Sequence, residues 1–234
     1  MAVLDPDLLL RAYSVGVFPM ADSRDAPDVF WVEPKRRAIL PLEQFRMSRS
    51  LRKSVRGDVF GLTVDRAFAA VVRHCASRPE TWINVGIEAA YNQLHRQGHA
   101  HSVECWSGEE LVGGLYGVRL GGAFFGESMF SLQPDASKVA LAWLVARLRV
   151  GGFRLLDCQF MTPHLASLGA IEIPQKDYIA LLSSALSASG AATGGGAAGV
   201  EFGALDRLLA GAAERSGGGT PPGWVIAQLL GQTS

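Results

Sequence analysis

The segment that decides the fold is Gly121-Gly122-Ala123-Phe124-Phe125-Gly126-Glu127-Ser128-Met129-Phe130. It is apolar, aromatic and glycine-rich, which is typical of a strand in the middle of a sheet. Its one carboxylate, Glu127, would lose its hydration there and would need a partner or a function. The alternative is a core strand whose Glu127 side chain points to solvent.

The segments on either side of this strand predict a mixed sheet. Strands expected over 101–106 and 111–118 precede it, and turns at Gly108-Glu109 and Gly121-Gly122 join the three into an antiparallel meander. A helical stripe follows, and then a strand over 153–160. A strand, a helix and another strand suggest a crossover that makes the last strand parallel to its neighbour. The expected class is α+β, with helices flanking a mixed sheet.

Composition divides the chain into three parts. Residues 1–57 combine short strands and helices and are expected to form a small N-terminal α+β domain, and residues 58–187 carry the main sheet. Residues 188–234 are rich in Gly and Ala, so we expect a flexible C-terminal tail. A weak helix over 202–213 and docking of residues 224–226 are the structured alternatives there.

Asp157-Cys158-Gln159 is the second informative segment. On a strand Asp157 and Gln159 share one face, about 6.6 Å apart at the backbone, while Cys158 faces the other way. The two polar groups either satisfy each other or meet Glu127 in one cleft. In the second case Leu115, Phe124, Met129 and Leu144 are expected to form its apolar walls.

Several other residue types have two interpretations. Gly113, Gly114 and Gly117 indicate either close approach of a ligand or a bulged, tightly packed sheet. His99 and His101 lie two apart without a third ligand type nearby, so we expect structural histidines and no metal. Cys158 has no evident basic partner, which argues against a nucleophile.

Composition and charge limit the possible partners. The 234 residues contain no apolar run near the ~20 residues that span a bilayer, so no membrane partner is expected. Three cysteines without CxxC spacing suggest a reducing cytoplasm. Net charge is zero, but residues 33–56 hold eight bases and two acids, a net +6. Such a patch is either an ordinary solvated face or a docking site for an anion or nucleic acid.

These segments resemble the leucyl/phenylalanyl-tRNA–protein transferases over residues 8–186. Gly126 to Phe130 together with Asp157 to Gln159 is a specific pair. The other matching motifs keep their order and spacing and include Gly16-Val17-Phe18-Pro19, Ser48-Arg49-Ser50, Thr81-Trp82-Ile83, Gly98-His99-Ala100-His101-Ser102, Leu111-Val112-Gly113-Gly114-Leu115 and Ala136-Ser137-Lys138.

The resemblance implies an acetyltransferase-like (GNAT) fold and an enzyme that needs no cofactor and no metal. Such an enzyme transfers Leu or Phe, and less well Met, from the acceptor end of aminoacyl-tRNA to proteins or peptides that begin with Arg or Lys. The product is marked for N-end-rule degradation in the cytoplasm. We expect the enzyme to act as a monomer.

The resemblance also implies roles for individual residues. Asp157 would polarise Gln159, which accepts a hydrogen bond from the attacking amine, and Glu127 would hold the basic residue of the acceptor. Leu115, Phe124, Met129 and Leu144 would bind the aminoacyl side chain, and the basic helix with Arg49, Lys53 and Arg56 would contact tRNA phosphates.

This chain departs from the family at Met20. Many members have a Trp there that stacks on the terminal adenine, an interaction worth about 1–3 kcal/mol per base. Met20 still has the bulk to pack there, and Trp82 is the other candidate for the role.

Two other functions use the same features. An acetyl-CoA-dependent acetyltransferase would need a glycine-bearing pyrophosphate loop, but residues 133–138 read Gln-Pro-Asp-Ala-Ser-Lys. A non-catalytic RNA-binding protein would use the basic helix and leave Glu127, Asp157 and Gln159 without a function.

Overall fold

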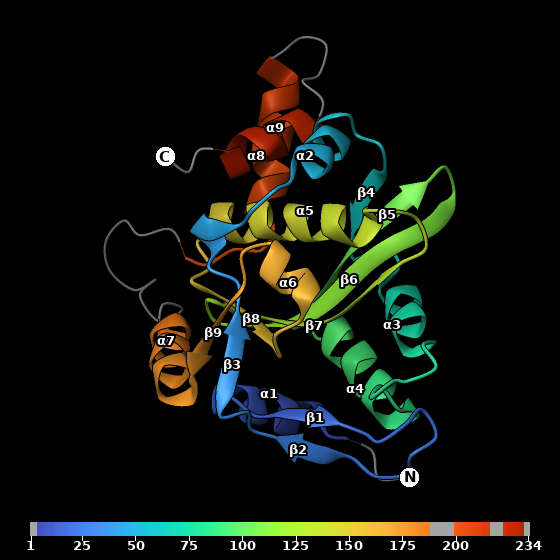
Figure 1. Ribbon diagram of the computed structural model, residues 1–234, viewed down its shortest axis with the longest axis vertical. Coiled ribbons are helices and arrows are strands. Elements are labelled where there is room, and N and C mark those ends of the chain that lie inside the picture. The colour runs from blue at the N-terminus through green and yellow to red at the C-terminus, as the bar shows by residue number, and fades with distance from the viewer. Residues whose placement is uncertain (1–3, 188–198, 216–221, 232–234) are drawn as a thin grey trace.

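Seven strands form one mixed sheet at the centre of the molecule, in the order β4-β5-β6-β7-β8-β3-β9 (Figure 1). The computed structural model describes residues 4–187, 199–215 and 222–231. The strands are β1 (Phe18–Met20), β2 (Phe30–Val32), β3 (Arg36–Ile39), β4 (Gly61–Val64), β5 (Ala100–Ser107), β6 (Glu110–Leu120), β7 (Ala123–Ser131), β8 (Leu155–Gln159) and β9 (Ile171–Pro174). The helices are α1 (Pro6–Ser14), η1 (Leu42–Gln44), α2 (Arg49–Arg56), α3 (Phe68–Ala76), α4 (Val85–Arg96), α5 (Ala136–Val150), α6 (Pro163–Ser167), α7 (Gln175–Ser187), α8 (Ala204–Arg215) and α9 (Pro222–Gly231).

The segment that decides the fold is β7, and its predicted surroundings are confirmed. Strands β4 to β7 pair antiparallel in sequence order. Helix α5 then crosses over, and β8 pairs with β7 in parallel, with Phe125 opposite Asp157. The parallel pairing ends there although β7 continues to Ser131, so the two strands part beyond that point.

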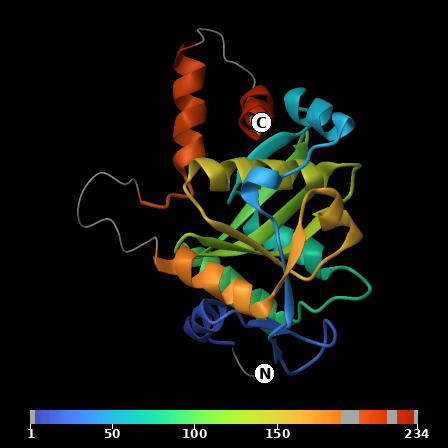
Figure 2. The same cartoon turned by 60° about the vertical axis from the view of Figure 1, so that its left-hand side comes forward.

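Helices cover both faces of the sheet (Figure 2). Helix α5 lies across one face and is buried along most of its length, because α2, α8 and α9 pack on its outer side. Helices α1, α3, α4 and α7 supply the apolar side chains that cover the other face. None of the helices in the described ranges is long and apolar enough to cross a membrane.

The N-terminal region does not form a separate unit up to residue 57. Strands β1 and β2 make a small two-stranded sheet of their own. Strand β3, however, pairs with both β8 and β9 inside the main sheet, and the backbone N–H of Leu40 donates to the carbonyl of Leu156 at 2.9 Å. A boundary at 57 would cut through this sheet, so it lies earlier in the chain.

The region after residue 187 contains two packed helices. Phe202, Leu205, Ile226 and Leu230 are buried in the same core as α5. Helix α9 lies beside α2, and the backbone N–H of Gly223 donates to a carboxylate oxygen of Asp58 at 2.8 Å. The expectation of a flexible tail is therefore corrected for α8 and α9, because their apolar residues reach a core. Residues 188–198, 216–221 and 232–234 lie outside the described residues.

The glycines of β6 serve close packing within the protein. A Cβ atom at Gly117 would lie 2.3 Å from the carbonyl oxygen of Phe125, at a register shift between β6 and β7. A Cβ at Gly113 would lie 2.5 Å from the Cβ of Ala136 in α5. Of the two interpretations of these glycines, the bulged and tightly packed sheet is the one observed.

We expect Gly117→Ala to lower the free energy of unfolding by about 1–3 kcal/mol, since the added methyl overpacks the β6–β7 contact. Gly61→Ala in β4 is the matched control, because its added Cβ would be no closer than 3.7 Å to any atom. Urea unfolding of both variants measures the difference. Equal losses in the two variants would contradict the packing argument.

Candidate active site

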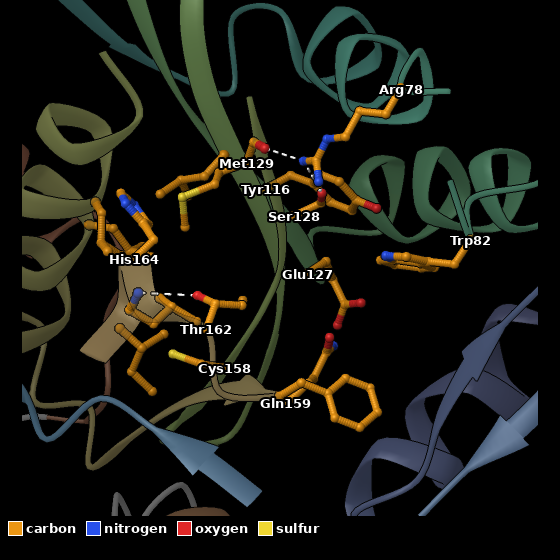
Figure 3. Close-up of a pocket in the computed structure, with 17 residues that line it drawn as sticks. Arg78, Trp82, Tyr116, Glu127, Ser128, Met129, Cys158, Gln159, Thr162 and His164 are labelled. Atoms are coloured by element: carbon orange, nitrogen blue, oxygen red, sulfur yellow. Dashed lines mark hydrogen bonds between the residues drawn. The ribbon is translucent and has the colours of Figure 1, made fainter. Parts of the chain in front are cut away.

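A cavity of about 370 Å³ opens where β7 and β8 part (Figure 3). One wall is apolar and is formed in part by α5. It is formed by Leu115, Met129, Leu141, Leu144 and Leu156. The opposite side carries Trp82, Glu127 and Gln159. An apolar wall facing a few convergent polar groups is the usual form of a small-molecule site.

Glu127 is buried and held by two tyrosines. The hydroxyl of Tyr13 in α1 donates to Oε1 at 2.7 Å, and that of Tyr91 in α4 donates to Oε2 at 2.8 Å. Burial raises the pKa of Glu127 to about 7, although hydrogen bonds from the hydroxyls of Tyr13 and Tyr91 and from the Gln159 amide lower it in part. The carboxylate has no cationic partner within the described residues, so it is a buried anion that changes protonation near neutral pH.

Gln159 reaches the cavity because the backbone turns at the end of β8. Its φ of +61° lies in the left-handed region and interrupts the alternation of the strand. Its amide points toward Glu127 (Figure 3), and Nε2 is buried without a hydrogen-bond partner among the described residues. An unpaired buried N–H donor is costly, and the pKa of Glu127 responds to a hydrogen bond from Gln159, so the amide is coupled to that carboxylate.

Asp157 does not reach the cavity. Its carboxylate receives two hydrogen bonds from Arg37, at 2.9 Å to Oδ1 and 2.6 Å to Oδ2, and a third from the hydroxyl of Tyr178 at 2.9 Å. Oδ1 also accepts from the backbone N–H of Gln159 at 2.8 Å. Asp157 therefore fixes the turn that directs Gln159, and its contact is with the backbone of Gln159.

Arg37 is not part of a solvated patch. It is 1% exposed, and its guanidinium lies between the rings of Phe18 and Tyr178 at 4.6 Å from each centroid. Nη1 also donates to the carbonyl of Gly16 at 2.8 Å. Nothing in the local sequence distinguishes Arg37 from Arg36, so both are predicted to belong to the basic patch of residues 33–56.

The predicted cavity residues divide into two groups. Leu115, Met129 and Leu144 line the apolar wall as expected, and Trp82 lines the opposite side. Phe124 does not line the cavity. It is fully buried and its ring stacks on Phe202, 5.7 Å away. Met20 pairs with Phe30 in the β1–β2 sheet and also lies outside the cavity lining.

Cys158 lines the cavity instead, which corrects the expectation that it faces away. The turn at Gln159 explains this, because two successive side chains reach the same space. Burial raises the pKa of the Cys158 thiol, so it stays protonated and is a poor nucleophile.

His101 is bonded within the fold. Its Nδ1 lies 2.7 Å from a carboxylate oxygen of Asp65, and its ring stacks on Phe202. Across the described ranges no three His, Cys, Asp or Glu side chains gather where they could hold a metal ion.

The basic helix is α2, which Ser48 caps by accepting from the N–H of Leu51 at 3.1 Å. Arg49, Lys53 and Arg56 are exposed on it, while Leu51 and Val55 bury the opposite side. These bases do not line the cavity. A separate cationic surface and an apolar cavity are therefore both present.

Four residues of this site are not predictable from the sequence. Tyr13 and Tyr91 bind Glu127, Arg37 binds Asp157, and Arg78 lies on the cavity rim. No local pattern indicates that two tyrosines from different helices meet one carboxylate.

Comparisons with known proteins identify the family of this chain. A family model described as "Leucyl/phenylalanyl-tRNA protein transferase" matches residues 39–183, and the model of that family's N-terminal domain matches residues 2–35. The chain belongs to this family. It is thus an aminoacyltransferase, and the family's own boundary falls between residues 35 and 39, just as β3 begins in the main sheet.

Proteins named "Leucyl/phenylalanyl-tRNA--protein transferase" are similar in sequence over most of this chain. The protein of Rhizorhabdus wittichii is 63% identical, with 100% of both chains covered. That of Novosphingobium aromaticivorans is 53% identical over 99% of this chain and 97% of its own. The protein of Zymomonas mobilis is 62% identical over 79% of this chain and 70% of its own.

The buried Arg37–Asp157 pair gives a stability prediction. We expect Arg37→Met to lower the free energy of unfolding by about 3–5 kcal/mol, because it leaves an unpaired buried carboxylate. Arg36→Met is the control, since Arg36 pairs with Glu172 at the surface and should contribute about 1 kcal/mol or less. Guanidinium unfolding measures both. A loss in the first variant no larger than in the second would rule out the proposed importance of the pair.

Proposed function

We propose that this chain transfers Leu or Phe, and less well Met, from aminoacyl-tRNA to the N-terminal Arg or Lys of acceptor proteins. The new peptide bond marks the acceptor for N-end-rule degradation. One observation carries the proposal: an apolar wall and a buried carboxylate line the same cavity, and the Gln159 amide points toward the carboxylate (Figure 3). The two sides suit the two substrates.

The apolar wall suits the side chain of the donor. This wall offers no hydrogen-bond partner to a polar aminoacyl side chain. It is formed by Leu115, Met129, Leu141, Leu144 and Leu156. Such a wall distinguishes apolar side chains by about 1–3 kcal/mol per methylene. Leakage from Leu and Phe to Met is therefore expected, whereas charged aminoacyl groups are excluded.

Trp82 is our candidate for stacking on the terminal adenine. It lines the cavity, whereas Met20 does not. Exposed Arg49, Lys53 and Arg56 on α2 support binding of tRNA phosphates further from the reacting end. Their contribution should weaken steeply as salt rises.

Glu127 suits the basic residue of the acceptor. Its ionised form lacks a cation among the described residues, so a guanidinium or ammonium group entering the cavity would supply one. Tyr13 and Tyr91 hold the carboxylate in position before the acceptor arrives. This preorganisation reduces the cost of binding.

The chemistry needs only positioning. The donor ester is already activated, and the acceptor α-amine has a pKa of about 8, so a useful fraction is neutral at pH 7. In our proposal Gln159 accepts a hydrogen bond from this amine and aims it at the ester carbonyl. The C–N bond forms, the ester C–O bond breaks, and the amine proton ends on the departing ribose oxygen. Asp157 acts as a positioning residue through the backbone of Gln159.

A transfer assay tests the proposed function. Phe-tRNA and a peptide that begins with Arg should yield a peptide extended by Phe, and a peptide that begins with Ala should not. Mass spectrometry of the product is the measurement. Absence of transfer to both Arg and Lys peptides, at saturating tRNA, would refute the proposal.

Exchange of Glu127 for Gln separates binding of the acceptor from activation of the ester. We expect kcat/KM for an Arg peptide to fall about tenfold or more, because a charge-assisted contact is lost. Hydrolysis of the bare Phe ester should change much less. Equal losses in both reactions would refute the acceptor role of Glu127.

The pH profile gives an independent test. Below pH 7 the Glu127 carboxyl is mostly protonated, and the acceptor amine deprotonates only near pH 8, so two ionisations raise kcat/KM as pH rises. We expect log kcat/KM to rise more steeply between pH 6 and 7 for the wild-type enzyme than for Glu127→Gln, which keeps only the amine ionisation. Parallel profiles would show that Glu127 does not titrate in the productive encounter.

A further inference from the structure

A second cavity of about 360 Å³ lies beside the first and shares Arg78, Met129 and His164 with it. It continues along β7 toward Ser131. The proposed donor and acceptor side chains occupy the first cavity, so the second has no assigned occupant. Its position next to the reacting groups makes it a candidate for the part of a substrate that extends out of the site.

Arg78 stands at the boundary between the two cavities. Its Nη2 donates to the hydroxyl of Ser128 at 3.0 Å and to the carbonyl of Met129, which holds the guanidinium over β7. Its remaining N–H groups have no hydrogen-bond partner in the part of the chain that the structure describes. The side chain is exposed, so these donors are open to a ligand.

The lining of the second cavity favours an anion. It contains Arg78, two histidines and Ser137, and no acidic side chain is among the lining residues. The hydroxyls of Ser77 and Ser131 also line it but already donate to backbone carbonyls. Ser137 belongs to the first turn of α5, and the N-terminal end of a long helix favours negative charge. The nearby Asp135 carboxylate is paired with Lys138 at 2.8 Å.

His164 adds a second sign of an unfilled site. Its Nε2 is buried without a hydrogen-bond partner among the described residues, and the ring lines both cavities. Burial and the charge of Lys138 lower the pKa of His164, so the ring is neutral at pH 7 and Nε2 can accept from a hydroxyl or, in the other tautomer, donate to an oxygen.

Position along the chain connects this cavity to the nucleotide. Arg78 and Trp82 lie on the same segment between α3 and α4, and Figure 3 shows them on the same side of the first cavity. If the terminal adenine stacks on Trp82, the phosphate attached to its ribose is the nearest anion to Arg78. We propose that the second cavity binds the phosphate on the 5′ side of the terminal adenosine, with Arg78 as its main ligand; this rests on the proposed function.

Two minimal donors test the proposal. One is the 3′-phenylalanyl ester of adenosine, and the other is the same ester carrying a 5′-phosphate, so the pair differs by one phosphate group. The measured quantity is the ratio of kcat/KM for the phosphorylated donor to that for the unphosphorylated donor, with an Arg peptide as acceptor. We expect Arg78→Ala to lower this ratio about tenfold or more, the size of one lost charge-assisted contact.

Arg73→Ala is the matched control, since Arg73 is an exposed arginine of α3 that lines neither cavity. It should keep the wild-type ratio. An unchanged ratio in Arg78→Ala would overturn the proposal, and if both donors then lose activity equally, the role of Arg78 is structural only. A loss that depends on the second residue of the acceptor peptide would assign the cavity to the acceptor chain instead. Failure of the proposed function is a separate result, in which the wild-type enzyme uses neither donor nor Phe-tRNA.

Discussion

The buried ion pair between Arg37 and Asp157 is the constraint on which the site depends. Arg37 lies on β3, Asp157 on β8, and the pair is completed by Tyr178 of α7 and the carbonyl of Gly16. It thereby ties together the N-terminal region, two strands and a helix at the point where β7 and β8 part. Because removal of either charge leaves the other buried and unpaired, this junction is held rigidly.

Two carboxylates on neighbouring strands have opposite electrostatic environments. Asp157 has a full cation and two further donors, the hydroxyl of Tyr178 and the backbone N–H of Gln159, and it serves the fold. Glu127 has neutral donors and no cation among the described residues, and burial raises its pKa to about 7. An anion without a cation inside a protein is destabilising, and such groups are retained where a substrate supplies the missing charge. The difference supports different functions for the two residues.

Preorganisation extends beyond these residues. The turn at Gln159, with φ of +61°, is an unfavourable backbone conformation held by its N–H bond to Asp157. Helix α5 forms the support of the apolar wall, and α2, α8 and α9 bury its outer side. A reaction that relies on positioning benefits from this arrangement, because small displacements of the amine from the ester are costly in rate.

Local sequence determined the secondary structure and much of the topology, because turn residues and apolar periodicity act over a few residues. The local sequence predicted the β5–β7 meander and the crossover through α5. It also singled out Glu127 and Gln159 as polar side chains on apolar strands. Only the tertiary structure decided which charges are buried. Arg37 and Arg36 are adjacent and chemically equal, yet Arg37 is 1% exposed because Phe18 and Tyr178 cover its side of β3, whereas Arg36 pairs with Glu172 at the surface. The same holds for Tyr13, Tyr91 and Phe124, whose partners are far away in the chain: burial and pairing depend on contacts between distant segments, which no local pattern specifies.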